Sequence, residues 1–371
     1  MNPALHKTLA FALIVGVGVL MRRKLADPRQ LDGVKALILS VALPATIFVA
    51  LLTIEVEPAL LALPVLALAF NGALFLATRA ALPAAGVDPD SPRGRTLQML
   101  VPSLAPGLSC FPYVLEYLGD GPLAWAALAD VGNKVFVLVL LYLLAMHWHR
   151  RLRAQPEAAD GSWGRLGRAL VQEPVNLVLV AGLALVAFGI RLDALPLFLQ
   201  DAVERMSALM TPMVLLFIAL AVRARRGDAL LLTTALCGRA GFALGASALV
   251  LALVPMPSPE AAVLAVVFPL SACSFWPYAH LATVEAMGDE GAAPVFDVDL
   301  GLAVLAFSLP VSTALILAVC SAGETFSRPL PVACAAAAML AVAGGAALRQ
   351  RRSTVRAAAP RFEPDGRLVA E

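Results

Sequence analysis

Charged residues are scarce in this sequence. Only 15% of its 371 residues are Asp, Glu, Lys or Arg, whereas 60% are hydrophobic. Typical soluble domains carry about 25% charged residues, and a chain this apolar could not hide its hydrophobic surface from water. We therefore predict an all-α membrane protein whose solvent is the lipid bilayer, because lipid offers no hydrogen-bond partner to the backbone of an open strand.

Motifs for catalysis and nucleic-acid binding are also missing. The sequence has no phosphate-binding glycine loop, no His-Glu metalloprotease pattern, no Gly-x-Ser-x-Gly and no patch typical of nucleic-acid binding. Its five cysteines lie in apolar stretches and lack metal-ligand spacing, so we expect small core residues rather than disulfides or zinc ligands. We predict no enzyme activity, no cofactor, no metal site and no nucleic-acid partner.

Apolar stretches long enough to cross a bilayer, which takes about 20 helical residues, occur eleven times. They are 5–21, 33–53, 59–79, 96–118, 123–146, 174–190, 205–222, 229–254, 259–286, 295–320 and 329–348. Arginine and lysine cluster after the first, third, fifth, seventh and eleventh stretches, whereas the loops at 53–57 and 255–257 have none. The positive-inside rule then predicts an outside N-terminus and a cytoplasmic C-terminus. The first stretch has no small-residue cleavage site, so we expect it to remain as a helix.

One pattern of residues occurs twice along the chain. Phe-Pro-Tyr at 111–113, Gly-Asp at 119–120 and Asp-Val-Gly at 130–132 return as Trp-Pro-Tyr at 276–278, Gly-Asp at 288–289 and Asp-Leu-Gly at 299–301. Pro44 and Pro212 are 168 residues apart, close to the 165 residues between Pro112 and Pro277 and the 169 between Asp130 and Asp299. A hydrophobic chain with an internal duplication and a proline within a helix of each half is typical of secondary transporters.

Each half of the chain that contains one copy of the pattern holds five of the predicted spans, the first to fifth or the sixth to tenth. Because five is odd, the second copy must enter the membrane from the opposite side, which predicts two inverted five-helix repeats. The predicted parts are a first repeat (1–146), a cytoplasmic linker (147–173), a second repeat (174–320), an extra C-terminal transmembrane helix (321–352) and a polar cytoplasmic tail (353–371). We expect the tail to be disordered.

Prolines interrupt the fourth and ninth spans. Pro102, Pro106 and Pro112 lie in the fourth, and Pro277 lies in the ninth. An interior proline removes a backbone donor and costs about 3 kcal/mol, and in lipid the freed carbonyls must be satisfied by protein or by water in a cavity. Two broken crossover helices meeting near the midplane would present half-helix N-termini that attract anions. Two tolerated kinks are the alternative.

The residues around these prolines are candidates for substrate binding. Their aromatic faces suit an apolar body, and the tyrosine hydroxyls could bind a carboxylate, although core or membrane-interface aromatics have the same composition. The candidates are Cys110, Phe111, Pro112, Tyr113, Phe275, Trp276, Pro277 and Tyr278, together with Arg239 as a counter-charge.

Polar and ionisable residues within spans form the second candidate set, for ion coupling or as buried charge. An Asp, Lys or Arg at a helix centre costs about 2.5–3.5 kcal/mol to insert. The set is Asp130, Asn133, Lys134, His280, Glu285, Asp297 and Asp299. Asp130 and Lys134 have the spacing of an intrahelical ion pair. Asp299 has no lysine four residues on, so it is a candidate titrating carboxylate or simply a hydrated residue at a helix end. Arg239 could instead pair with an acid, and His280 could be a core histidine.

Three segments resemble the bacterial auxin efflux carrier (AEC) family, often called malate permeases. They are Arg22–Lys24 leading to Leu-Pro-Ala-Thr-Ile-Phe at 43–48, the stretch from Gly119 to Asn133, and Met-Thr-Pro-Met-Val-Leu-Leu at 210–216. The resemblance implies ten core helices in two inverted repeats, with a scaffold of spans one, two, six and seven and a mobile transport domain made of the rest. Bile-acid:sodium symporters share that architecture. Many AEC members have asparagine beside the crossover prolines, whereas this chain has aromatic residues there.

These observations together predict a secondary transporter in a bacterial inner membrane. We expect it to move small organic anions, such as malate-like or auxin-like carboxylates, by elevator-type alternating access, with a proton or sodium as the coupling ion. A sodium-coupled symporter of the bile-acid type and a non-transporting ligand sensor are alternatives. An intramembrane aspartyl protease would need Tyr-Asp and Gly-x-Gly-Asp elements, but Asp130 and Asp299 follow Ala129 and Val298. A homodimer is one option for the assembly.

Overall fold

The computed structural model describes a helical protein. The described residues are 10, 13–14, 16–22, 24, 27–53, 60, 62–153, 174–221, 228–286 and 293–358, and the regular elements among them are all helices. In the first half these are α2 (Pro28–Leu37), the π-helix η1 (Ile38–Ala42), α3 (Leu43–Thr53), α4 (Leu63–Ala81), η3 (Leu82–Ala85), α5 (Pro92–Leu100), α6 (Pro106–Ser109), α7 (Phe111–Leu118), α8 (Asp120–Lys134), the π-helix η4 (Val135–Leu140) and α9 (Leu141–Arg153).

The second half continues with the same kind of element. It contains α11 (Pro174–Ala187), η5 (Leu192–Ala194), α12 (Leu197–Ala208), α13 (Met210–Ala221), α14 (Ala229–Leu253), α15 (Pro259–Val267), η6 (Phe268–Leu270), α16 (Phe275–Ala286), α17 (Val298–Ala322), η7 (Gly323–Ser327) and α18 (Pro329–Ala358).

Seven helical stretches within the described ranges are long and apolar enough to cross a membrane. They are Arg29–Thr53, Leu63–Ala85, Asp120–Leu152, Ala229–Leu253, Pro259–Glu285, Val298–Ser327 and Pro329–Arg351. Their length and composition are those of an integral, multi-pass membrane protein, as the sequence predicts. The relation of the two halves as inverted repeats stays a prediction.

The other predicted spans differ from single long helices for local reasons. Eight of the 17 residues in the stretch 5–21 lie outside the described part of the chain, and α11 is only 14 residues long. The stretch 205–222 divides into α12 and α13 next to Pro212, whose ring conflicts with the carbonyl four residues earlier, that of Ala208. The stretch 96–118 divides into α5, α6 and α7.

Two boundaries of the predicted parts fall inside helices. Helix α9 continues to Arg153, so the first residues of the predicted linker are helical, and residues 154–173 lie outside the described part. Helix α18 continues to Ala358, beyond the predicted start of the tail at 353, and residues 359–371 are again outside the described part.

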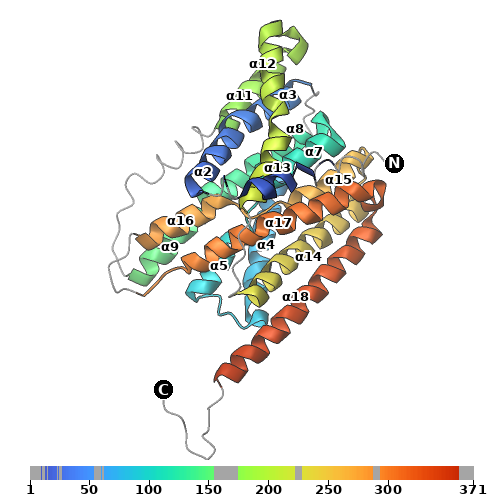
Figure 1. Cartoon of the computed structure of the whole chain (residues 1–371). Helices are drawn as coiled ribbons and strands as arrows, with labels where there is room; N and C mark the ends of the chain where they lie inside the picture. The colour runs from blue at the N-terminus through green and yellow to red at the C-terminus, as the bar shows by residue number, and fades with distance from the viewer. Residues whose placement is uncertain are drawn as a thin grey trace, which may run out of the picture.

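The helices pack as a bundle with an extension at one end. Helices α3, α11 and α12 lie together there, at the top of Figure 1, and α18 runs along the side of the bundle against α14. Glycines on α14 allow this close approach: a Cβ at Gly241 would lie 2.6 Å from Cγ of Leu340 on α18. Small residues at helix contacts are the usual means of close packing in membranes.

The helices that lead into the two interrupted spans, α5 and α15, begin alike. Each has nine residues, a serine N-cap and a proline at its first position. The Ser91 and Ser258 side chains accept hydrogen bonds from the third backbone N–H after them, at 3.1 and 3.2 Å. Serine at the cap and proline at the first turn are strong start signals, so both helices begin at a fixed residue.

Candidate functional site at the crossing of two broken helices

The first break lies between α5 and α6. Residues 101–105 are not helical, because Pro102 and Pro106 cannot donate to the preceding turn. Pro112 is the second residue of α7, where a missing N–H costs nothing. Of the three prolines predicted to interrupt this span, Pro102 and Pro106 therefore lie at the break and Pro112 lies after it.

The second break lies between η6 and α16. Pro269 stands in the short 3₁₀ turn η6, and residues 271–274 are not helical before α16 begins at Phe275. Pro277 is the third residue of α16, so here too the proline of the repeated pattern follows the break. In both interrupted spans the repeated proline therefore lies in the first turn of a helix that follows the break, α7 or α16.

The two breaks lie against each other in the interior. The backbone N–H of Ala105 donates to the carbonyl of Ala272 at 2.8 Å. The N–H of Ala272 donates to Oγ of Ser109 at 2.8 Å, and the N–H of Ser274 donates to Oγ of Ser103 at 2.9 Å. Each break thus supplies partners for the backbone of the other, which meets the requirement that buried amides be hydrogen-bonded.

The side chain of Arg239 on α14 donates hydrogen bonds to backbone carbonyls of the first break. Its Nε donates to the carbonyl of Val101 at 2.8 Å and its Nη2 to that of Ser103 at 3.0 Å. Its residue is 4% exposed, and no carboxylate among the described residues pairs with it. A cation at the C-terminal end of α5 also complements the helix dipole. The sequence left open that Arg239 pairs with an acid, and no such pair occurs among the described residues.

Asn133 of α8 holds the next residue of the break. Its Nδ2 donates to the carbonyl of Leu104 at 3.0 Å, and its Oδ1 accepts from the N–H of Leu104 at 3.2 Å. The same side chain donates to Asp130 at 2.7 Å and accepts from Nδ2 of Asn71 at 2.9 Å. The sequence analysis missed Asn71, although a lone amide in the apolar stretch 59–79 is a signal that would have indicated it.

Asp130 and Lys134 form the predicted ion pair beside this asparagine. Nζ of Lys134 lies 3.7 Å from Oδ2 of Asp130, and their side chains are 8% and 7% exposed. The π-helix η4 starts at the next residue, Val135, and such irregular turns often occur at functional sites. The polar cluster next to the first break therefore consists of Asn71, Asp130, Asn133 and Lys134.

The acidic candidates of the second half lie elsewhere, near the end of α16 and the start of α17. Glu285 accepts hydrogen bonds from the N–H groups of Val295 and Phe296, both at 3.0 Å. Asp297 is the N-cap of α17: its Oδ1 accepts from the N–H of Leu300 at 2.9 Å, and its carboxylate lies 3.7 Å from Nε of Arg93. These two acids hold the backbone of residues 295–300 at the start of α17.

Asp299 does not match Asp130 in position. It lies in the first turn of α17 and is exposed, whereas Asp130 is buried near the end of α8. Asp299 is thus exposed at the start of its helix, and its role as a titrating or a hydrated carboxylate stays a prediction. The two aspartates differ because α17 starts only one residue before Asp299, whereas α8 starts at Asp120, ten residues before Asp130. The second Gly-Asp pair, at 288–289, lies outside the described residues.

His280 links α16 to the π-helix. Its Nε2 lies 3.0 Å from the carbonyl oxygen of Val137 in η4, and its ring meets that of Tyr142 edge-on, with centroids 5.3 Å apart. Both contacts are those of a packed histidine between two helices.

The aromatic candidates separate into two groups. Cys110, Phe111, Pro112 and Tyr113 are buried in the core. Phe275 and Trp276 are 47% and 38% exposed at the start of α16, where the Phe275 ring packs against Tyr278 at 5.8 Å and Pro277 is buried. Only the second group is accessible to a ligand.

A lysine that the sequence analysis missed lies at this accessible group. Nζ of Lys35 on α2 is 3.8 Å from the centroid of the Phe275 ring, a cation–π contact. Lys35 stands at the start of the stretch 33–53, where a single charge in an apolar segment could have indicated it. The start of α16 thus combines a helix N-terminus, a cation and aromatic faces.

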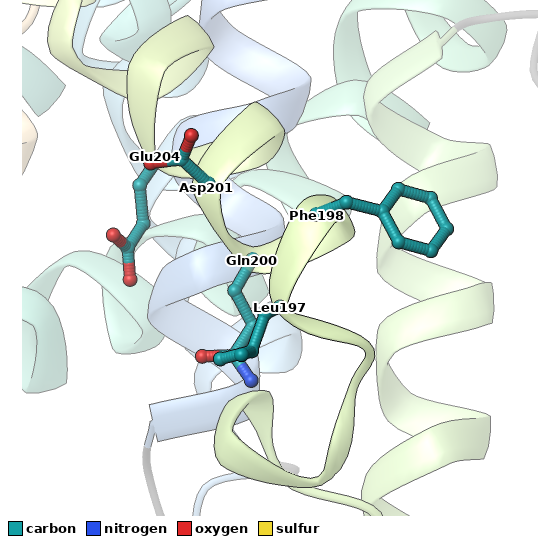
Figure 2. A pocket seen from close by; sticks show the side chains of 5 residues that line it. All are labelled: Leu197, Phe198, Gln200, Asp201 and Glu204. Carbon is teal, nitrogen blue, oxygen red and sulfur yellow. The ribbon is translucent and has the colours of Figure 1, made fainter.

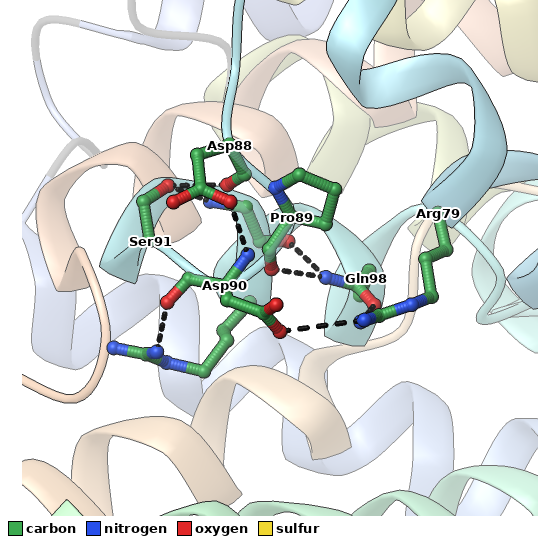
Figure 3. A network of polar contacts seen from close by, with 8 residues as sticks. Arg79, Asp88, Pro89, Asp90, Ser91 and Gln98 are labelled. Atoms are coloured by element: carbon green, nitrogen blue, oxygen red, sulfur yellow. Dashed lines mark hydrogen bonds and ion pairs between the residues drawn. The ribbon is translucent and has the colours of Figure 1, made fainter.

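A polar network outside the crossing fixes the start of α5. Figure 3 shows Arg79, at the end of α4, reaching Asp90 and Gln98: its guanidinium lies 3.4 Å from the Asp90 carboxylate and 3.0 Å from Oε1 of Gln98. Gln98 in turn donates to the carbonyl of Pro89 at 2.7 Å. A Cβ at Gly94 would lie 2.1 Å from the carbonyl oxygen of Asp88, so glycine is required where this loop crosses α5.

A surface hollow on α12 does not resemble a binding site. Figure 2 shows its five lining residues, which all come from this one helix: Leu197, Phe198, Gln200, Asp201 and Glu204. Asp201 already pairs with Arg205 at 2.9 Å. The hollow lacks a second wall and is acidic, so it does not suit an organic anion.

Comparison with known proteins identifies no relative. No protein-family model matches the sequence and no curated protein matches it, so the resemblance to the AEC family rests on the quoted residues and remains a prediction. Groups of three or more His, Cys, Asp or Glu that could hold a metal ion are absent from the residues that the structure describes.

Proposed function

We propose that this protein is a secondary carrier of small organic anions that works by alternating access. The observation that carries the proposal is the hydrogen-bonded crossing of two broken helices, with Ala105 donating to Ala272 at 2.8 Å, inside a protein with the helices of a multi-pass membrane protein. Non-helical backbone at membrane depth is tolerated where it is buried in protein or lines a cavity. In secondary transporters, discontinuous helices of this kind form the substrate site.

The matching starts of α5 and α15 support an elevator-type movement with inverted repeats. Helices α5 and α15 have the same length and the same Ser-Pro start, and each leads into a proline-broken segment. Equivalent segments of opposite repeats exchange their environments when such a carrier changes the side to which its site is open. The proposed site is the crossing together with the start of α16.

One cation and one helix N-terminus support an anionic substrate. Lys35 lies over Phe275 at the start of α16, and a helix N-terminus attracts negative charge. The exposed faces of Phe275 and Trp276 suit the apolar body of a carboxylate. We place the substrate here rather than at Tyr113, which is buried in the core.

The buried Asp130–Lys134 pair is the proposed coupling element. Taking two charges out of water costs several kcal/mol per ion, so such a pair adds little to stability by itself. Protonation of Asp130, or a sodium ion beside it, would change the charge next to the first break at Leu104. A proton is our first choice for the coupling ion, and sodium, as in symporters of the bile-acid type, is the alternative.

Reconstituted protein tests the function directly. Purified protein in liposomes should take up radiolabelled mono- or dicarboxylates when a proton or sodium gradient is imposed, and empty liposomes are the control. Dependence on sodium at constant pH would identify the alternative coupling ion. Saturable binding without any flux would instead indicate a ligand sensor, and it would contradict the carrier proposal.

A pair of aspartate variants tests the site. Asp130→Asn should reduce gradient-driven uptake to near background. Asp201→Asn is the matched control, because Asp201 and Arg205 have the same four-residue spacing on the exposed face of α12. Equal uptake by the two variants would contradict the role of Asp130.

The proposed setting is a bacterial inner membrane with a cytoplasmic C-terminus. The basic residues that follow alternate apolar stretches support this orientation. A reporter enzyme that is active only in the cytoplasm should be active when it is fused after Glu371. An inactive reporter would contradict the cytoplasmic C-terminus.

A further inference from the structure

A cavity of about 290 Å³ lies between α4, α14 and α18. Its walls are mainly apolar side chains, such as Leu74 of α4, Phe242 of α14 and Leu340 of α18. Leu340 is also 50% exposed at the surface, so the cavity is open to the outside of the bundle beside α18. Helices α4, α14 and α18 are all among those that could cross a membrane, which places this opening toward lipid.

One charged side chain lies in the cavity wall. Arg239 is 4% exposed, and it lines the cavity together with Val101 of the first break. Its Nε and Nη2 donate to the carbonyls of Val101 and Ser103. Hydrogen bonds from its Nη1 to other described residues are absent, so the N–H groups of this nitrogen are left for a further acceptor in the cavity.

Apolar walls with a single cation define the ligand chemistry. A carboxylate accepts charge-assisted hydrogen bonds from a guanidinium, and these are stronger than neutral ones. A second negative charge on the same ligand would be buried without a partner, which is unfavourable. The volume is at the lower end of the range of about 300–1,000 Å³ seen for small-molecule sites. The ligand should therefore be short, apolar along its length and singly charged.

We propose that this cavity binds a medium-chain alkyl monocarboxylate, with the carboxylate on Arg239 and the alkyl chain along α4, α14 and α18. This is a second ligand site, separate from the proposed transport site at the start of α16. Because Arg239 also holds the carbonyls of the first break, an occupied cavity would stabilise the broken conformation of residues 101–105.

Two neighbouring glycines on α18 provide a matched test. A Cβ at Gly344 or at Gly345 would meet no atom within 4 Å, so both tolerate a side chain. Gly344 lines the cavity, whereas Gly345 does not. Leucine at either position gains the same helix propensity, and only Gly344→Leu occupies ligand space.

The experiment measures binding of radiolabelled octanoate to full-length protein in nanodiscs of phosphatidylcholine. We expect octanoate to bind saturably to the wild type, and with the same affinity to the control variant Gly345→Leu. In Gly344→Leu the affinity should fall about tenfold, which corresponds to about 1.4 kcal/mol. Octanamide, which lacks the charge, should not compete. Arg239→Lys should weaken binding as well, because an ammonium lacks the planar fork.

Several results would overturn the proposal. They are the absence of saturable binding by the wild type, equal affinities for the two leucine variants, and competition by octanamide. Displacement of octanoate when phosphatidylglycerol is added to the nanodiscs would assign the cavity to a phospholipid, which also rejects a free carboxylate. Uptake of carboxylates in liposomes is a separate measurement, so failure of this site and failure of the carrier proposal are distinguishable.

Discussion

The Asn133 side chain pairs with both backbone groups of Leu104: its Oδ1 accepts from the Leu104 N–H at 3.2 Å, and its Nδ2 donates to the Leu104 carbonyl at 3.0 Å. A single side chain on an intact helix thus replaces the hydrogen bonds that the broken helix loses at this residue. Such replacement is what permits non-helical backbone within a membrane. The same asparagine also bonds Asp130 at 2.7 Å, so the break and the buried ion pair are directly connected.

Asn133→Leu should therefore destabilise the protein more than Asn71→Leu. The first change leaves both Leu104 backbone groups buried without this partner, at a cost of about 1–3 kcal/mol for each group. The second change removes one hydrogen bond, that of Asn71 to Asn133. Thermal unfolding of the two variants in detergent, followed by tryptophan fluorescence, measures the difference. Equal loss would contradict the role of Asn133 at the break.

Ser103→Ala and Ser109→Ala test the contact between the two breaks. Each removes the acceptor of a backbone N–H from the opposite break, that of Ser274 or that of Ala272, and should cost about 1–3 kcal/mol of unfolding free energy. Thr233→Ala is the control, because its hydroxyl donates only to the carbonyl of Ala229 in its own helix. We expect less than about 0.5 kcal/mol there.

If the breaks did not support each other, the serine variants would behave like the threonine control. The double variant Ser103→Ala/Ser109→Ala adds a second criterion. Because both serines act in one hydrogen-bond network, the two losses should deviate from additivity by more than about 0.5 kcal/mol.

Composition and proline positions predict the helical, membrane-spanning character of the protein and the interruption of two of its spans. An apolar chain with long hydrophobic stretches predicts membrane helices, and helices of that kind dominate the described residues. The fourth and ninth spans were expected to break at their prolines, and both are interrupted, at 101–105 and 271–274. Pro102 and Pro106 lie at the first break as predicted, whereas Pro112 and Pro277 lie after the breaks, because a proline in the first turn of a helix does not interrupt it.

The candidate site could be predicted only where its partners are close in sequence. Asp130 and Lys134 are one helical turn apart, so their pairing follows from spacing alone. The contacts of Arg239 with Val101 and of Lys35 with Phe275 join residues far apart along the chain. No local pattern specifies them. Asp299 shows the converse limit, since matching sequence spacing did not place it where Asp130 lies.

The Asp130–Lys134 pair gives a prediction that separates folding from coupling. Asp130→Asn leaves the Lys134 charge without its carboxylate and should cost about 3–5 kcal/mol of stability. The double variant Asp130→Leu/Lys134→Met removes both charges and should recover most of that loss. If the pair couples transport to an ion gradient, the double variant should fold well and still fail in gradient-driven uptake. Recovered uptake would assign the pair a purely structural role.

The contact between α4 and α8 limits substitution at Gly132. A Cβ there would lie 1.8 Å from the carbonyl oxygen of Pro64, so the two helices would have to move apart. Gly132→Ala should therefore destabilise the protein by about 1–3 kcal/mol. At Gly72, on α4 itself, a Cβ meets no atom within 4 Å, and Gly72→Ala should stabilise by up to about 1 kcal/mol through helix propensity. Unfolding of both variants in the same detergent measures the sign of each change. Because alanine improves the helix in both cases, opposite signs isolate the packing at Gly132, and two stabilised variants would contradict this close approach of α8 to α4.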